Sequence, residues 1–235
     1  MKRFILIGLM VCSLWGAKAQ IGHLMSYDKR HLHFGIQVGL TQSKFDVDYT
    51  WDDSIRAAMQ GVASYNAAGF HISVIGDYTI NRFLNLRILP GVTLLNRDVK
   101  YSWASDYAAT HPLVEDGRTV ESVYGEFPVE LKFRALRWKN FRPYITAGVD
   151  YGFDFASLRK NKNNNNESII RLNPNDLRYS AGIGIDVFLR YVKFAVEMKL
   201  VQGFIDLSVP DNDLYTLAVD RITSRTVLLS FTFEG

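Results

Sequence analysis

Cysteine is almost absent from this 235-residue sequence, since Cys12 is the only one. It lies within the first twenty residues, so a chain that loses this segment on export has none. Such a chain cannot carry a disulfide, a thiolate metal site or a catalytic cysteine. An exported protein that folds without disulfides needs another source of stability, such as a large core or a closed sheet.

The start of the chain has the layout of a secretory signal peptide. Residues 4–15 are almost entirely apolar, they follow a positively charged start, and a small-x-small cleavage site comes after them. We therefore expect residues 1–19 to be a signal peptide and residues 20–235 to form a single outer-membrane β-barrel domain. A lipoprotein signal is the alternative, but Cys12 follows a valine, which suits such a signal poorly.

The sequence also lacks an excess of one charge and a long apolar run. The formal charge of +3 comes from Lys2, Arg3 and Lys18, and it falls to zero when the signal is removed. This balance gives no support for nucleic-acid binding. No segment has the 18 or more continuous apolar residues of a membrane helix, and none after the signal shows a useful helical period.

What the sequence contains instead is a repeated alternation of polar and apolar residues. In the stretch "PYITAGVDYGFDF", residues 143–155, every second residue is apolar or aromatic. A period of two predicts a β-strand with two unlike faces. The pattern recurs in eight segments, at residues 31–43, 68–81, 83–97, 121–135, 140–157, 177–190, 192–207 and 221–234.

The connections between these segments alternate in length. Four are long and rich in Asp, Asn, Ser, Gly and Pro, at residues 44–67, 98–120, 158–176 and 208–220. Three are short, near residues 81–82, 136–139 and 190–191. Short turns on the periplasmic side and long loops outside are typical of outer-membrane barrels. The sequence therefore predicts an all-β, eight-stranded antiparallel up-and-down transmembrane β-barrel in the outer membrane.

A soluble barrel around an apolar ligand would show the same alternation with its apolar face inside. Three features favour the membrane barrel. The strands are long enough to cross a bilayer, the glycines fall on the polar face of a narrow lumen, and aromatic residues near strand ends suit interfacial girdles. The aromatic residues are Tyr78, Phe83, Phe127, Phe155, Tyr179, Tyr191 and Phe204.

Charged residues of the polar face would fill the lumen of an eight-stranded barrel. Buried ions must be paired or hydrogen-bonded, so the near balance of signs predicts a structural network that plugs the barrel. A proton or ion path is the functional alternative. The predicted lumen acids are Asp77, Glu126, Glu130, Asp150, Asp154, Asp186 and Glu197, and the bases are Arg87, Lys132, Arg134, Lys193 and Lys199.

Few residues suggest chemistry. His33 and His71 fall on the inward faces of neighbouring strands, and with Ser73 and Asp77 they make a Ser/His/acid group conceivable. An enzyme acting on membrane lipid would expose its groups to the bilayer, whereas these side chains point inward. We therefore interpret them as polar residues of the lumen and assign no catalytic residues.

Cofactor and metal sites have still less support. His23, His31 and His33 lie near the mature N-terminus, but no cysteine or carboxylate cluster completes a ligand set. Gly182-Ile183-Gly184 lies within a predicted strand and lacks the third glycine and the helix of the dinucleotide motif. We expect no cofactor, no metal and no small-molecule substrate.

The stretch "VYGEFPVELKFRALRWKNFRPYITAGVDYGFDF" carries a family resemblance. It is similar to the PorT family of Bacteroidota outer-membrane β-barrel proteins, and the likeness continues through residues 182–207 and the ending "DRITSRTVLLSFTFEG". The matching positions are Tyr124, Glu126, Pro128, Val129 and Lys132 before a short turn, and Arg142, Pro143, Tyr144 and Gly148 after it.

The resemblance implies a component of the type IX secretion system, which exports proteins with a C-terminal sorting domain and supports gliding motility in some members of the phylum. Its cargo includes proteases, but the resemblance implies machinery and no catalytic residues. Other type IX proteins and outer-membrane lipid would be the partners. Two alternatives remain: a structural or adhesive barrel whose long loops bind external ligands, and a lipid-modifying outer-membrane enzyme.

Overall fold

The computed structural model describes residues 27–49, 59–103, 117–155, 173–208 and 219–235. No helix within these ranges is long and apolar enough to cross a membrane. The predicted signal peptide lies outside them. The described elements are the 3-10 turn η2 (Tyr27–Lys29) and the strands β1 (Leu32–Tyr49), β2 (Met59–Tyr65), β3 (Ala67–Thr79), β4 (Leu84–Ile88), β5 (Gly91–Trp103), β6 (Gly117–Arg134), β7 (Phe141–Asp154), β8 (Asn175–Phe188), β9 (Lys193–Gly203) and β10 (Val219–Glu234).

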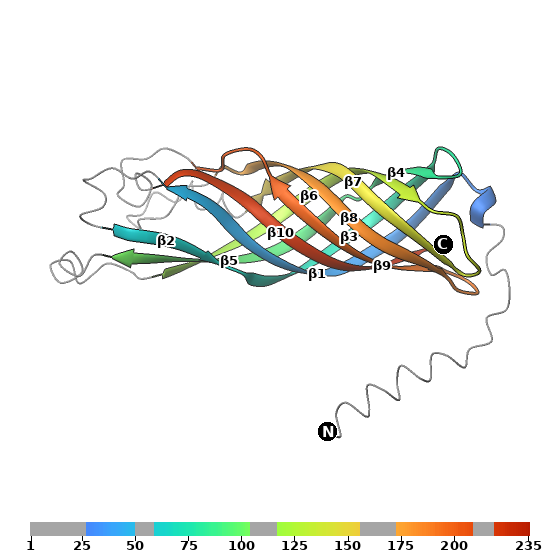
Figure 1. Cartoon of the computed structure of the whole chain (residues 1–235), viewed down its shortest axis with the longest axis horizontal. Coiled ribbons are helices and arrows are strands. Elements are labelled where there is room, and N and C mark those ends of the chain that lie inside the picture. Colours follow the sequence, from blue (N-terminus) through green and yellow to red (C-terminus); the bar gives the residue numbers. More distant parts are fainter. Residues whose placement is uncertain (1–26, 50–58, 104–116, 156–172, 209–218) are drawn as a thin grey trace, which may run out of the picture.

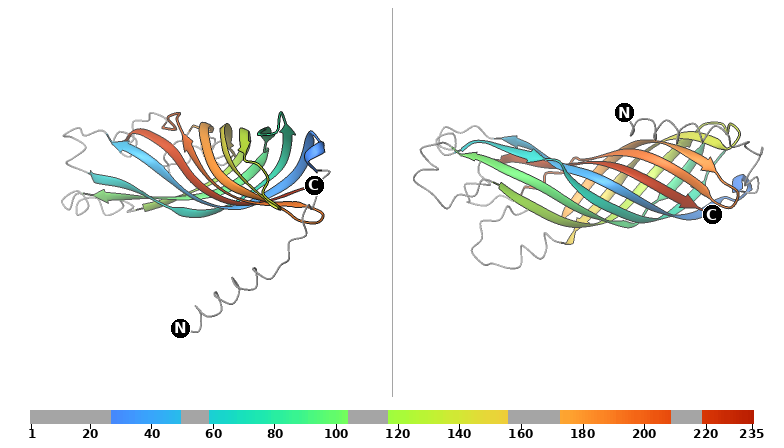
Figure 2. Two further views of the ribbon diagram at one scale, coloured as in Figure 1. Left: turned by 45° about the vertical axis from the view of Figure 1, so that its right-hand side comes forward. Right: turned by 90° about the horizontal axis from the view of Figure 1, so that it is seen from below.

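The strands form one closed antiparallel sheet whose strands run obliquely to the long axis (Figures 1 and 2). β1 pairs with β10 on one side, from Gly35 opposite Glu234 to Tyr49 opposite Val219, and with β3 on the other. β2 and β3 together make one pass along the barrel, and β4 and β5 together make another. We call each full pass a stave. The ring therefore has eight staves, and the predicted up-and-down barrel is confirmed.

The stave made by β4 and β5 is interrupted at Leu89 and Pro90. Proline has no backbone N–H and cannot donate to a ladder. The neighbouring strands compensate, because Leu89 N donates to the carbonyl oxygen of Pro128 at 3.1 Å and Val74 N donates to that of Pro90 at 3.0 Å. The wall therefore stays hydrogen-bonded on both sides of the interruption, which the sequence pattern alone presented as one continuous strand.

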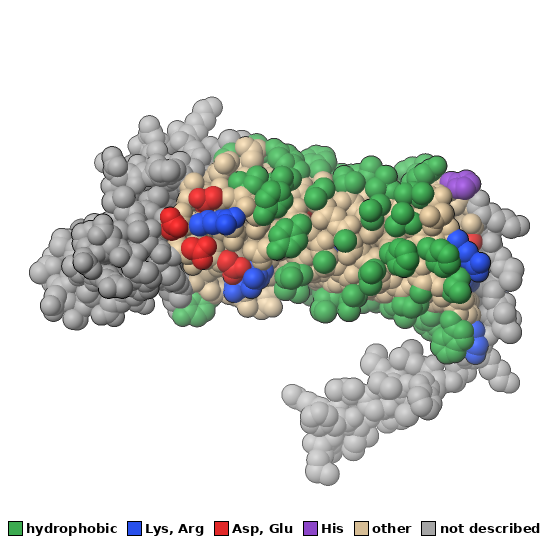
Figure 3. All heavy atoms as spheres, turned by 45° about the horizontal axis from the view of Figure 1, so that its top comes forward, with side chains coloured by type: hydrophobic (Ala, Val, Ile, Leu, Met, Phe, Trp, Pro, Cys, Tyr) green, Lys and Arg blue, Asp and Glu red, His purple; other side chains and the backbone are tan. Residues whose placement is uncertain are grey.

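The outer surface carries a wide belt of apolar side chains, which covers the barrel wall in Figure 3. Val149, near the middle of β7, is 55% exposed, and the seven predicted girdle aromatics are all exposed. An apolar band on the outside with the polar face inside is the arrangement of a membrane barrel. The apolar-outside assignment of the two faces is therefore confirmed.

Glycines on the inner face make room for large lumen side chains. A Cβ atom at Gly184 would collide with the ring of Tyr144, and one at Gly152 would lie 3.0 Å from Nη2 of Arg178. Any larger residue at these positions would displace the side chains that fill the barrel. The glycines of the polar face are thus required by packing inside the lumen.

The predicted segments place the outer strand ends incorrectly. β1 continues to Tyr49, β5 continues to Trp103 and β6 begins at Gly117, all within connections that the sequence predicted to be long loops. The apolar alternation of the sequence fades in these parts, although the ladder of backbone hydrogen bonds continues. Conversely, β7 ends at Asp154 and β9 at Gly203, before the predicted ends.

Candidate functional site

A cluster of charged side chains closes the lumen from wall to wall. Arg87 on β4 reaches Glu197 on β9, at the opposite side of the ring, with 2.8 Å between Nη1 and Oε2. The Tyr144 hydroxyl donates to the same oxygen at 2.8 Å. Lys199 Nζ lies 2.5 Å from Glu130 Oε1 and 3.0 Å from Glu197 Oε1. These five residues, the central cluster, are fully or almost fully buried.

A second cluster lies nearer the long connections. Arg178 Nη2 lies 2.7 Å from Glu126 Oε1 and also pairs with Asp150. The Thr93 hydroxyl donates to Glu126 Oε2 at 2.6 Å, and His71 Nδ1 lies 2.7 Å from that hydroxyl. Residues from five different staves meet here, so the barrel is filled at this level too.

A third cluster lies at the short-turn end. Lys193 Nζ is 2.5 Å from Glu234 Oε2, and Lys132 Nζ is 2.8 Å from Asp186 Oδ1. The hydroxyl of Tyr27, on η2, donates to Glu234 Oε2 at 2.8 Å. Burial raises the pKa of this phenol above its ordinary value, which keeps it a donor. The segment before β1 is thereby fastened to the end of the last strand.

The prediction of a charged, plugged lumen is confirmed, because every acid and base predicted for the lumen is buried. Among the residues that the structure describes, sequence reasoning missed four further buried ions: Arg142, Asp176, Arg178 and Glu234. A usable signal was present. Each of the four lies an even number of residues from a residue on the same strand that was assigned to the inner face, so it faces the same side. Arg178, for example, precedes the inward Ser180 by two residues.

The histidines considered for catalysis lie at different levels of the barrel. His33 stands opposite Asp77, whereas His71 stands opposite Gly39 on the same strand pair. Six residues along β1 correspond to about 20 Å. His33 instead stacks on Tyr27, with 3.7 Å between ring centroids. The four residues considered together from the sequence are therefore not one group.

His71 nevertheless lies between a hydroxyl and a carboxylate. Its Nε2 is 3.1 Å from Ser73 Oγ and its Nδ1 is 3.3 Å from Glu126 Oε2, so the acid beside it is Glu126 and not Asp77. The Ser73 hydroxyl, however, donates to Gln37 Oε1 at 3.2 Å, and Ser73 is only 3% exposed. Ser73 is thus buried, and the arrangement belongs to the hydrogen-bonded network that fills the lumen.

For the histidines considered as metal ligands, His23 lies outside the described residues. His33 Nε2 is 3.1 Å from the Arg30 carbonyl oxygen, and His31 Nδ1 is 3.4 Å from that of Thr79. The described ranges contain no group of three or more histidine, cysteine or acidic side chains that could hold a metal ion. These two rings serve local contacts at the end of the barrel.

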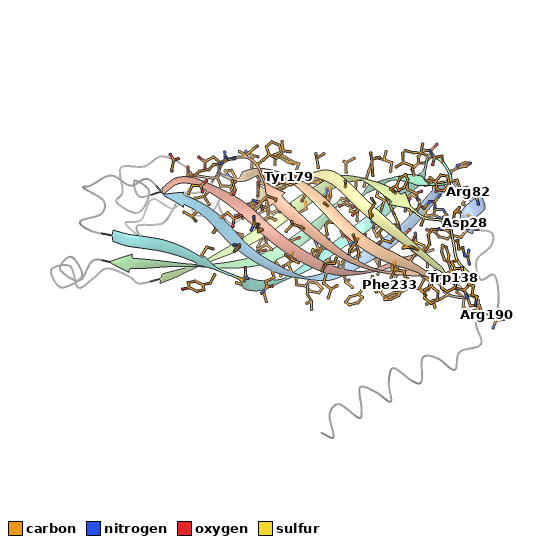
Figure 4. All side chains as sticks on the ribbon, viewed as in Figure 1. Asp28, Arg82, Trp138, Tyr179, Arg190 and Phe233 are labelled. Atoms are coloured by element: carbon orange, nitrogen blue, oxygen red, sulfur yellow. The ribbon has the colours of Figure 1, made fainter. Side chains whose placement is uncertain are left out.

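At the short-turn end, beyond the third cluster, a pocket of about 570 Å³ opens between the turns. Arg82, Arg134, Arg137, Arg142 and Asp28 line it, and Figure 4 labels Asp28 and Arg82 at this end. We call it the mouth pocket. Asp28 Oδ1 lies 3.0 Å from Arg142 Nη1, and Asp28 Oδ2 lies 3.5 Å from Arg137 Nη1. One carboxylate thus serves two arginines.

Comparison with known proteins agrees with this geometry. A family model described as "Outer membrane protein beta-barrel domain" matches residues 18–209. The chain belongs to this family. As its surface belt and closed sheet require, it is an outer-membrane β-barrel protein located in the lipid of that membrane.

Solved structures show the same fold at low sequence identity. The outer membrane protein OprG from Pseudomonas aeruginosa is 16% identical, with 91% of this chain and 98% of that chain covered and a TM-score of 0.50. The outer membrane protein AlkL, solved in lipid bilayers, is 11% identical, with 92% and 93% covered and a TM-score of 0.47. Neisserial surface protein A is 11% identical, with 85% and 95% covered and a TM-score of 0.42. No curated protein matches this barrel by sequence.

Proposed function

We propose that this outer-membrane barrel is a non-enzymatic accessory or assembly component of the type IX secretion machinery. The observation that carries the accessory role is the closed lumen. Arg87 and Glu197 meet across the ring, and three charged clusters fill the barrel in succession. A folded cargo protein cannot pass through such a barrel, so a role in export requires contacts with other machinery proteins.

The link to type IX secretion rests on the residues of β6 and β7 that resemble the PorT family. Several of these residues make side-chain contacts inside the barrel. Glu126 belongs to the second cluster, Lys132 pairs with Asp186, and Tyr144 donates to Glu197. The pattern that carries the resemblance is therefore in large part the pattern that fills the lumen.

The non-enzymatic assignment is supported by the burial of the reactive side chains. Ser73 and His71 are 3% exposed and face the lumen, not the lipid. A lipid-modifying enzyme needs its nucleophile at the bilayer. In a strain carrying His71→Ala, we expect unchanged lipid A and phospholipid profiles by mass spectrometry. An altered profile would contradict the proposal.

Deletion of the gene tests the proposed role directly. We expect cargo proteins with a sorting domain to accumulate inside the deletion strain and to return to the surface on complementation, as measured by fractionation and immunoblotting. Export should also survive Arg87→Met with Glu197→Leu, because in this proposal the cargo does not pass through the lumen. Normal surface export in the deletion strain would refute the proposal.

An adhesive barrel is a second candidate, favoured by the polar wall beyond the apolar belt. Asp46 pairs there with Lys44 at 3.2 Å and with Arg225 at 3.0 Å, and Figure 3 shows acidic and basic side chains gathered at this end. At this end β1 and β10 stay paired up to Tyr49 opposite Val219. Loop deletions that abolish adhesion while export continues would favour this candidate.

A further inference from the structure

Positive charge is concentrated around the mouth pocket. Arg82 lies in the turn between β3 and β4, Arg134 ends β6, Arg137 lies in the following turn, and Arg142 is near the start of β7. Asp28 on η2 is the only acidic side chain among the described residues that line the pocket. Four arginines from two turns and two strands therefore line a pocket with one carboxylate, and that carboxylate pairs with two of them.

The donors of two of these arginines are incompletely used. Arg142 gives both terminal nitrogens to Asp28, at 3.0 and 3.2 Å, and Arg134 Nη2 donates to the carbonyl oxygen of Asn81 at 3.1 Å. Both side chains are more than nine-tenths buried, and the Nε atom of each has no hydrogen-bond partner among the described residues. Buried donors without acceptors are unfavourable, so an added anion would stabilise this arrangement.

The acids deeper in the barrel do not cancel this charge. Asp186 is 2.8 Å from Lys132 Nζ, and Asp77 accepts a hydrogen bond of 2.5 Å from Asn85 Nδ2. Lys193 Nζ lies 3.9 Å from Asp186 and 4.0 Å from Asp77. Both carboxylates therefore already interact with lysines of the third cluster or with the Asn85 amide.

The rim of the mouth pocket is apolar and faces outward. Ile80 and Leu136 line it, and they are 49% and 55% exposed. Phe83, in the turn between β3 and β4, is also exposed. Because short turns of a barrel end at the periplasmic leaflet, this rim lies at the level of lipid headgroups. A guanidinium fork binds phosphate through paired charge-assisted hydrogen bonds.

We propose that the mouth pocket binds the phosphate group of a phospholipid of the periplasmic leaflet. The lipid tails lie against the apolar rim, the phosphate enters between the arginines, and Asp28 competes with it for Arg137 and Arg142. This site is independent of the proposed role in secretion, because it rests on the pocket alone.

Two variants should change the affinity for phosphate in opposite directions: the single variant Asp28→Asn and the double variant Arg82→Gln/Arg134→Gln. The protein is purified in a maltoside detergent, which carries no phosphate, and titrated with dihexanoylphosphatidic acid by isothermal calorimetry. We expect the double variant to bind about tenfold more weakly, since charge-assisted hydrogen bonds are lost. Asp28→Asn should bind more tightly than the parent. Arg190→Gln, which changes an exposed arginine in a different turn, is the matched control and should bind as the parent does.

Two other probes decide the source of the phosphate. Inorganic phosphate and an acidic tetrapeptide are titrated under the same conditions, and we expect both to bind more weakly than the lipid. Tighter or equal binding of either probe would overturn the lipid assignment. Absence of lipid binding by a protein that keeps its heat-modifiable gel mobility, or an Asp28→Asn variant that binds no better, would also overturn the proposal.

Discussion

The central cluster and the mouth pocket contain the same kinds of side chain in different proportions. In the central cluster, Arg87 and Lys199 face two carboxylates and a tyrosine hydroxyl. In the mouth pocket, four arginines share the lining with one carboxylate, that of Asp28, whose side chain is about one-third exposed and pairs with two of them. Charges deep in the lumen are matched because burial makes an unpaired ion very costly. At the mouth pocket the excess of arginine leaves buried donors without internal acceptors, and an added anion would supply the missing acceptors.

Removal of a carboxylate from the central cluster should have the largest effect on the stability of the barrel. Glu197→Ala leaves Arg87 and Lys199 short of acceptors in a buried site, and we expect a loss of about 3–5 kcal/mol of unfolding free energy. Urea unfolding in lipid vesicles measures it. The double variant Arg87→Met/Glu197→Leu should recover much of the loss. A loss below about 1 kcal/mol for Glu197→Ala would show that the cluster is not sealed from water.

The lipid face is tested by a charge on the same strand as the buried Asp150. Val149→Arg should cost about 2–4 kcal/mol if the site lies near the bilayer midplane. Val149→Leu is the matched control and should be nearly neutral. Unfolding in vesicles measures both. An arginine variant that inserts and folds as well as the parent would mean that the two faces are assigned the wrong way round.

A smaller effect is expected where the inner wall is crowded. Gly184→Ala places a methyl group against the ring of Tyr144, whose hydroxyl donates to Glu197, and overpacking of this kind costs about 1–3 kcal/mol. Gly76→Ala is the control, because its Cβ would approach only the carbonyl oxygen of Ile88, at 3.9 Å. Equal stability of the two variants would show that the lumen packing is adaptable.

The smallest effect on stability is expected at the mouth pocket. Asp28→Asn breaks ion pairs that are partly exposed, so the loss should be no more than about 1 kcal/mol. Together with the tighter lipid binding expected for the same variant, this would separate a pocket built for a ligand from a cluster built for stability. A loss comparable to that of Glu197→Ala would show that both regions are structural.

Much of the barrel wall was predictable because it follows a local rule. Each predicted segment has its apolar face outside, and the predicted lumen ions, such as Glu130 and Lys199, are buried. Partners were not predictable, because the residues that meet in space lie far apart in the chain. Glu126 was assigned to the lumen, but its contacts with Arg178 and Thr93 depend on the stagger of the closed sheet. The outer strand ends were missed because the apolar alternation of the sequence fades there although the strands continue to pair.

By itself, the sequence determined the number of staves, the direction of each face and the balance of charge, since all three follow from a period of two and from composition. The pairing of partners came from the tertiary structure, which brings Arg87 to Glu197 across the ring and Arg137 and Arg142 to Asp28. The tilt and stagger of a closed barrel set which inward residues share a level, and those quantities come from pairing around the whole ring.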